Sequence, residues 1–398
     1  MNELVYPREK TLGAITLVLG TLVWIALVVG TFGGALLALA AGFLGYLFVQ
    51  SALISHIKGN GVELSQSQFP DLHAEFAACC KTLQLTATPS AYILNGNGAL
   101  NAFATQFLRT QYVVLNSDVV DAMNQHADGL RFYMGHELGH LRMKHLSGHF
   151  LRWPVLWLPL VGAAYSRARE STCDRHGLAC SGSPEGATKA LAALSAGSER
   201  WKQLDVNAYR EQAEHSRGFW MSFHELTAAY PWLTKRAARV LDADAPLPSR
   251  NGFAYIPAAL VPFAGRLGGG FGFLIMVYIV GVMAAIGIPA YHDYTVRAKL
   301  AKVVAESQSA RTSLASYYTK NSRVPESLDA AGAPRQLADG SVLVLDSKNM
   351  VLTIETKQGE LVFVPEADSQ GRVTWSCRNG EKLKATQVPQ SCRGAGIP

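Results

Sequence analysis

Residues 136–140 read His136-Glu137-Leu138-Gly139-His140 and lie in a stretch that we expect to be helical, opened by Asp128 as N-cap. Residues four apart share one face of an α-helix, so His136 and His140 can present imidazole nitrogens to one metal ion. Gly139 between them leaves space for a substrate backbone or for a neighbouring element. The spacing predicts a site for one Zn²⁺ per chain.

The acidic residue inside this pattern suggests which reaction the metal would support. Zinc lowers the pKa of a bound water toward about 7. Glu137 follows His136 directly and can approach that water from the side. Its carboxylate can then take a proton from the water and pass it to a leaving amine, as a general base does. The five residues therefore favour hydrolysis of peptide bonds.

A catalytic zinc ion keeps three protein ligands, so a third must come from elsewhere. A metzincin would need Gly and His three and six residues after His140, and those positions hold Met143 and Leu146, which excludes that class. We interpret the nearby His145 and His149 as surface or interfacial histidines.

Glu170 and Asp174 are the better candidates for the remaining positions at the metal. They are again four residues apart and share a helix face. One of them can bind zinc while the other orients a ligand histidine.

Hydropathy indicates a membrane protein. The chain has 398 residues, enough for two or three domains, and no charged residue occurs from Thr11 to Ser55. This run divides at residues 31–34 into two stretches that can each cross about 30 Å of hydrocarbon. A second uncharged run, Leu267–Tyr291, predicts a third membrane helix. Two adjacent spans do not fit a secretory signal, and the lipid bilayer is an expected partner.

The charge pattern argues against nucleic acid as a partner. The formal net charge of +6 is spread along the chain, without a basic cluster interleaved with aromatic residues.

The region between the spans is predicted to mix helices and short strands. We expect strands near residues 91–94, 101–105 and 111–115, and helices at 72–83, 117–125 and from 167 to about 245. Trp153–Ser166 is apolar but contains two prolines, and we interpret it as a loop or interfacial segment.

These features together resemble the HtpX-like and CaaX-prenyl-protease-like membrane zinc peptidases. The resemblance covers about residues 56–245 and rests on Asn101-Ala102-Phe103-Ala104, on the helix Gly135–His140, on Glu170-x-x-x-Asp174-Arg175 and on residues 231–236. It implies a gluzincin in which His136, His140 and Glu170 hold zinc, Asp174 supports a ligand and Glu137 is the base. It also implies that Asn101, Ala102, Phe103 and Ala104 form an edge strand that pairs with the substrate backbone.

One position departs from this family. Its members usually have a histidine before the later proline, where this chain has Tyr230. A tyrosine hydroxyl can donate to an oxyanion, which makes Tyr230 a candidate catalytic residue, although it can also simply pack. Arg236 can contribute there or form a structural ion pair, and the sequence leaves both open.

The C-terminal region resembles a type IV pilin. Residues 284–299 are similar to a pilin N-terminal helix, and the segments around Cys377 and Cys392 are similar to the two ends of its disulfide loop. We therefore expect a Cys377–Cys392 disulfide in an oxidising compartment. The position of the usual pilin glutamate holds Gly272, without a clear leader junction before it, so we interpret the domain as an anchored module and not as a filament subunit.

The predicted fold is a membrane-anchored multidomain protein with a mainly α-helical gluzincin domain, a small sheet in that domain, and an α+β pilin-like C-terminal domain. The expected parts are a transmembrane hairpin (1–55), a zinc metallopeptidase domain (56–250), a linker (251–266), a transmembrane helix (267–291) and a pilin-like extracytoplasmic domain (292–398).

This organisation predicts a multi-pass protein of a bacterial inner membrane, with the peptidase domain in the cytoplasm and the pilin-like domain in the periplasm. Expected substrates are misfolded or membrane-associated proteins or peptides, and envelope proteins are expected partners of the pilin-like domain. Two alternatives remain: a non-enzymatic envelope or pilus-associated scaffold with a vestigial zinc site, and a combination in which the outer domain recruits and the inner domain cuts.

Overall fold

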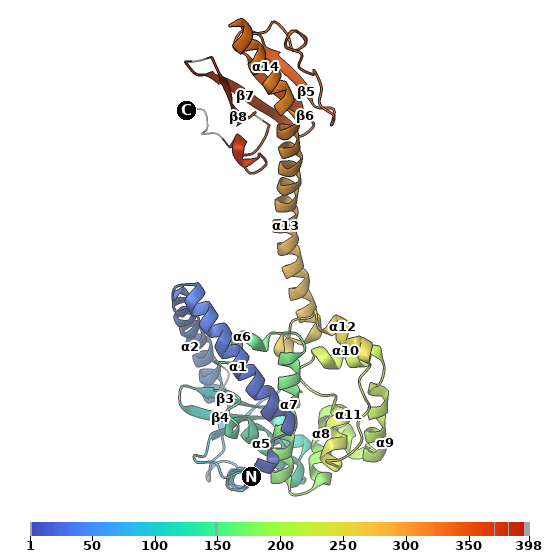
Figure 1. Ribbon diagram of the computed structural model, residues 1–398. Coiled ribbons are helices and arrows are strands. Elements are labelled where there is room, and N and C mark those ends of the chain that lie inside the picture. Colours follow the sequence, from blue (N-terminus) through green and yellow to red (C-terminus); the bar gives the residue numbers. More distant parts are fainter. Residues whose placement is uncertain (1, 148–149, 370, 381, 394–398) are drawn as a thin grey trace. The chain divides into compact units, whose positions relative to one another are not determined.

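A computed structural model describes residues 2–147, 150–369, 371–380 and 382–393 (Figure 1). His149, one of the two histidines expected at the surface, lies outside the described residues. The chain divides into two compact units, Met1–Val277 and Tyr278–Pro398. The helices and strands of the first unit are α1 (Pro7–Gly30), α2 (Gly34–Asn60), β1 (Val62–Glu63), α3 (Pro70–Thr82), β2 (Ser90–Leu94), β3 (Ala102–Phe107), β4 (Thr110–Asn116), α4 (Ser117–Ala122), α5 (Ala127–Arg142), α6 (Trp153–Leu156), α7 (Val161–Ser181), α8 (Pro184–Arg200), α9 (Val206–Glu211), α10 (Phe219–Thr227), α11 (Leu233–Leu241) and α12 (Tyr255–Ala258).

A four-stranded sheet in the order β1-β2-β4-β3 supports the first unit, and its strands confirm the three that the sequence predicted. β2 and β4 are parallel, while β3 pairs with β4 in an antiparallel hairpin and forms an edge. Alternate residues of β4 face opposite sides of the sheet. Val113 and Leu115 join the main core, which includes Leu138 of α5, whereas Tyr112 and Val114 pack with Ile57 of α2. The second apolar helix is thereby attached to the sheet.

Helix α5 carries the His-Glu-Leu-Gly-His stretch and is buried from Gly129 to Leu141 apart from Arg131. Its N-cap is His126, so the prediction of Asp128 as N-cap is wrong. Asp128 lies instead in the first turn, where a carboxylate complements the helix dipole.

The expected loop at residues 153–166 is largely helical. A single turn, α6, comes first, and α7 already begins at Val161. Pro154 and Pro159 do not prevent this, because proline is tolerated at the start of a helix and between two helices.

Three helical segments of the described chain are long and apolar enough to cross a membrane: Pro7–Gly30, Gly34–Asn60 and Gly269–Asn321. They occur where the uncharged runs predicted them. Gly33 separates the first two with φ of 84°, a conformation that favours glycine.

The second unit contains the C-terminal sheet. Its elements are the later part of α13 (Gly268–Glu306), α14 (Gln308–Asn321), β5 (Val342–Asp346), β6 (Val351–Thr356), β7 (Gly359–Ala367) and β8 (Val373–Asn379). The four strands form an antiparallel meander in chain order. Leu300 and Leu314 from the helices pack with Leu352 and Phe363 from the sheet.

The predicted disulfide joins Cys377 of β8 to Cys392 and is confirmed. It attaches the last described turn of the chain to the edge of the sheet. The sequence did not predict β8 itself, in which Thr374, Ser376 and Arg378 interrupt the apolar pattern.

Candidate metal centre

Helices α5 and α7 pack closely because glycine occupies their contact. A Cβ atom added at Gly135 would lie 2.6 Å from Cβ of Cys180, and one added at Gly139 would lie 3.0 Å from Cβ of His176. A larger residue would push the helices apart. Of the two uses that the sequence suggested for Gly139, the structure supports the close approach of a neighbouring element.

This contact places two imidazoles opposite one carboxylate. Nε2 of His136 lies 3.2 Å from Oε2 of Glu170, and Nε2 of His140 lies 3.8 Å from Oε1. All three side chains are buried, and Oε2 of Glu170 has no hydrogen-bond partner among the described residues. A buried carboxylate oxygen without a hydrogen bond is costly, and a divalent cation between the three groups would satisfy it. The residues therefore fit a zinc ion.

Asp174 connects His136 to a buried arginine. Its Oδ1 lies 3.0 Å from Nδ1 of His136, while Arg236 donates from Nη2 to Oδ1 at 2.6 Å and from Nε to Oδ2 at 2.9 Å. A carboxylate only accepts, so His136 directs its Nδ1–H toward Asp174 and keeps Nε2 for a metal. Arg236, whose role the sequence left open, forms a two-pronged ion pair with Asp174.

The charges around these imidazoles favour a cation. Burial lowers the pKa of His136, but the neighbouring carboxylates of Asp174 and Glu170 raise it further, to about 10. Burial would raise the pKa of Glu170, but the nearby imidazoles of His136 and His140 and the charge of Arg236 hold it well below its usual range. A bound dication would take the place of the proton on His136.

His145 is buried, so its prediction as a surface or interfacial histidine is wrong. Its Nδ1 lies 3.1 Å from Nδ1 of His140, and its Nε2 lies 2.8 Å from Oε1 of Glu9 on α1. No local pattern predicts this contact, because Glu9 and His145 are 136 residues apart.

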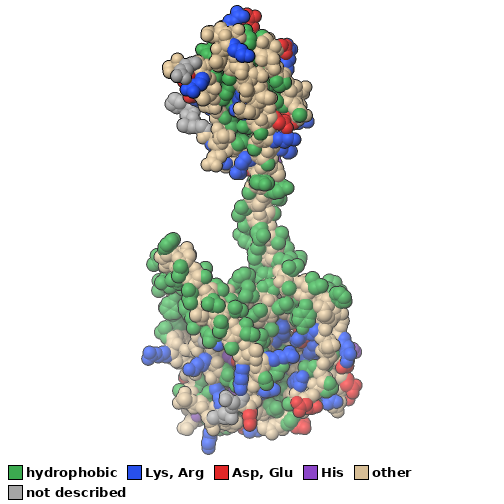
Figure 2. Space-filling model, in the orientation of Figure 1, with side chains coloured by type: hydrophobic (Ala, Val, Ile, Leu, Met, Phe, Trp, Pro, Cys, Tyr) green, Lys and Arg blue, Asp and Glu red, His purple; other side chains and the backbone are tan. Residues whose placement is uncertain are grey.

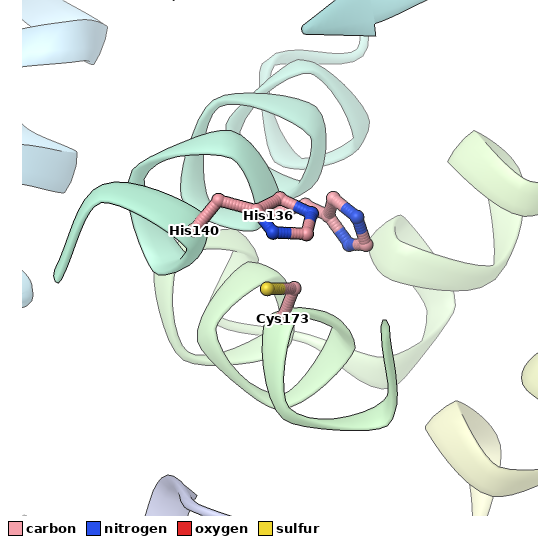
Figure 3. A group of neighbouring side chains, drawn as sticks. All are labelled: His136, His140 and Cys173. Carbon is pink, nitrogen blue, oxygen red and sulfur yellow. The ribbon is translucent and has the colours of Figure 1, made fainter. Parts of the chain in front are cut away.

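Cys173 is a further candidate ligand that the sequence did not suggest. Figure 3 shows its thiol, from α7, directed toward the imidazoles of His136 and His140 on α5, and one ligand atom from each of the three lies within 4.8 Å of the others. Burial raises the pKa of the thiol well above its ordinary value, which disfavours the thiolate that a metal binds. Glu170 is already ionised and lies close to both Nε2 atoms, so we favour Glu170 over Cys173.

The edge strand β3 passes beside the candidate base. Ala104 donates its backbone N–H to Oε2 of Glu137 at 2.8 Å. Ala104 therefore directs its N–H away from β4. The carbonyl of Asn101, with the opposite alternation, accepts from the N–H of Asn116 at the end of β4. The backbone N–H and C=O groups of Ala102 and Ala104 thus point toward the open edge of the sheet, while those of Phe103 point toward β4.

Tyr230 lies between α10 and α11 and is half-buried. It is close enough to Arg236 for the two groups to interact electrostatically. Its role as an oxyanion donor stays a prediction.

Two separate regions of the chain match known protein families. Residues 66–161 match the family described as peptidase family M48, and residues 296–393 match the family described as pilin (bacterial filament). The first match includes His136, Glu137 and His140 and ends before Glu170.

Several similar curated proteins are pilins or fimbrial proteins. The type IV major pilin protein PilE1 of Neisseria gonorrhoeae is 24% identical over 146 residues, which cover 30% of this chain and 88% of the pilin. Fimbrial protein EcpC of Eikenella corrodens is 26% identical over 137 residues, 31% of this chain and 88% of that protein. A fimbrial protein of Pseudomonas aeruginosa is 24% identical over 126 residues, 31% of this chain and 77% of that protein.

Two substitutions on α7 distinguish the candidate third ligands. We expect Glu170→Gln to weaken zinc binding by at least about tenfold, because the amide carries no charge, and Cys173→Ser to leave it within about threefold. Zinc affinity is measured in detergent by competition with a chromogenic chelator. A larger loss in Cys173→Ser than in Glu170→Gln would assign the third position to the thiol.

Proposed function

Because the chain joins a region matching peptidase family M48 to a pilin domain, we propose that it is a zinc-dependent endopeptidase acting beside a membrane. The observation that carries this proposal is the orientation of the Nε2 atoms of His136 and His140 toward Glu170. These three residues would hold the metal, and Asp174 with Arg236 would orient His136.

Glu137 supplies the proton transfers of the proposed reaction. Zinc, when bound, polarises the scissile carbonyl and acidifies water. Glu137 follows a ligand on the same buried helix, and its carboxylate would accept a proton from the attacking water and deliver it to the leaving amine. These side chains are buried, and the low local dielectric constant of a buried site strengthens their electrostatic interactions.

The open edge of β3 would hold the substrate. An extended peptide pairing with Ala102 and Ala104 would add a strand to the sheet, with main-chain hydrogen bonds that depend little on its side chains. The Ala104 N–H that now contacts Glu137 would then serve the peptide, placing its backbone beside the base. This fits broad specificity toward unfolded or membrane-associated chains, with Tyr230 as the candidate oxyanion donor.

The surface of the first unit supports action at a membrane. Figure 2 shows hydrophobic side chains gathered over the α1–α2 hairpin and near α10 and α12. Large apolar side chains are exposed in these segments and beside α6: Leu22, Val29, Leu37, Phe48, Trp153, Trp157, Trp220, Phe253, Ile256 and Leu260. Exposed apolar area of this kind marks an interaction surface, and tryptophans favour the membrane–water boundary.

The proposed topology is that of a multi-pass bacterial inner-membrane protein. The Cys377–Cys392 disulfide favours an oxidising compartment for the pilin domain, here the periplasm. Three spans would then leave the peptidase region in the cytoplasm, where Cys79, Cys80, Cys173 and Cys180 remain free thiols. Related pilins are fimbrial proteins, and we assign to this domain the recruitment of envelope proteins.

The catalytic proposal predicts a clear separation of binding from cleavage. Glu137→Gln should retain zinc with native affinity but lose at least about 10²-fold in activity on a casein-like substrate, because the general base is removed. Both values are measured on detergent-purified protein, with phenanthroline-treated native chain as control. Cleavage by Glu137→Gln at the native rate, or resistance of the native chain to the chelator, would contradict the mechanism; stoichiometric zinc without cleavage of any substrate would favour the scaffold alternative.

The topology is tested with reporter fusions. Alkaline phosphatase, which requires an oxidising compartment, should be active when fused after residue 393 and inactive when fused after residue 250. The reverse pattern would place the peptidase region outside the cytoplasm.

A further inference from the structure

Glu9 is a buried carboxylate at the start of a mostly apolar helix. It lies in the first turn of α1, two residues before the uncharged run, and only 6% of its surface is exposed. A buried charge is costly unless it is paired. The partner is His145, whose Nε2 lies 2.8 Å from Oε1 of Glu9.

The second nitrogen of His145 continues this contact toward the metal centre. Nδ1 of His145 and Nδ1 of His140 are 3.1 Å apart, and the two rings meet nearly edge to face, with an interplanar angle of 69°. The three side chains thus form a continuous series of contacts, from Glu9 on α1 through His145 to His140 on α5.

The direction of the two hydrogen bonds follows from the Glu9 carboxylate at one end of this series and the metal ligand His140 at the other. The carboxylate of Glu9 only accepts, so Nε2 of His145 carries the hydrogen. A metal on Nε2 of His140 leaves the hydrogen of that ring on Nδ1, where it is donated to the bare Nδ1 of His145. Sγ of Cys173 also approaches this Nδ1, at 3.6 Å, but the imidazole of His140 is closer. The contact with His145 thus holds the plane of the His140 ring in place.

We infer that Glu9 and His145 are positioning residues that hold the ligand His140 in its metal-binding orientation. This inference rests on the proposed zinc site. Asp174 contacts the ligand His136 directly. Glu9 would orient the ligand His140 through the intervening imidazole of His145. The first apolar helix would then be part of the metal centre as well as an anchor.

A role limited to attaching α1 explains the pair less well, because α1 has other attachments. Tyr6 donates its N–H to Oγ1 of Thr172 at 3.0 Å, and Trp24 donates from Nε1 to the carbonyl of Phe150 at 2.9 Å. A Cβ atom added at Gly20 would lie 2.1 Å from the carbonyl oxygen of Leu151. The helix is therefore attached at its start and near Gly20 and Trp24 without the buried charge.

The test replaces the pair by apolar residues of similar volume. The double variant Glu9→Met/His145→Phe leaves neither a buried charge nor an unpaired ring nitrogen at these two positions, so it should fold with a Tm near that of the native chain. Zinc affinity should nevertheless fall about 10–100-fold, the usual effect of losing a residue that orients a ligand. Glu9→Gln, which keeps an acceptor for His145, should stay within about threefold of native.

The matched control is Thr16→Val, a buried position on the same helix whose hydroxyl donates to the carbonyls of Leu12 and Gly13 within α1. All variants also carry Glu137→Gln, and zinc affinity is read by chelator competition together with the absorption spectrum of the Co²⁺-loaded chain. A double variant with native affinity and an unaltered Co²⁺ spectrum would overturn the inference, as would an equal loss in Thr16→Val. Neither readout needs a substrate, so absence of zinc from the native chain would count against the proposed function itself.

Discussion

The close contact between α5 and α7 is the constraint on which the rest of the site depends. Glycine at 135 and 139 of α5 and at 177 of α7 allows it; a Cβ at Gly177 would lie 2.8 Å from the backbone oxygen of Phe132. At this separation, the carboxylate of Glu170 reaches both imidazoles without leaving its helix. A wider crossing would leave the same residues in place along the sequence without one shared metal position.

Helix α7 also organises the segments that follow it. Arg167, one turn before Glu170, donates to the backbone carbonyls of Glu225, Leu226 and Ala228 at the end of α10. Burial lowers the pKa of Arg167 to about 10, yet three accepting carbonyls at the end of a helix suit its charge. One turn after Glu170, Asp174 accepts hydrogen bonds from Arg236 of α11. One face of α7 therefore contributes to the metal centre and also holds the segment that carries Tyr230.

The sequence predicted those parts of the site that repeat at helical spacing. His136, His140, Glu170 and Asp174 were recognisable because each pair is four residues apart, and β2, β3 and β4 because they alternate between turns. Gly139 was recognisable as a position where space is needed, but the pattern did not identify α7 as the neighbour that fills it.

Contacts between distant segments could not be predicted in this way. Arg236 is 62 residues from Asp174, and Glu9 is 136 residues from His145, so no local periodicity relates them. His145 was misassigned because a histidine after the end of a helix usually meets solvent, whereas here α1 covers it. Zinc K-edge X-ray absorption of the native chain, loaded with one equivalent of zinc in detergent, tests the central claim most directly. The account predicts only nitrogen and oxygen scatterers at about 2.0–2.2 Å, and a sulfur scatterer at about 2.3 Å would contradict it.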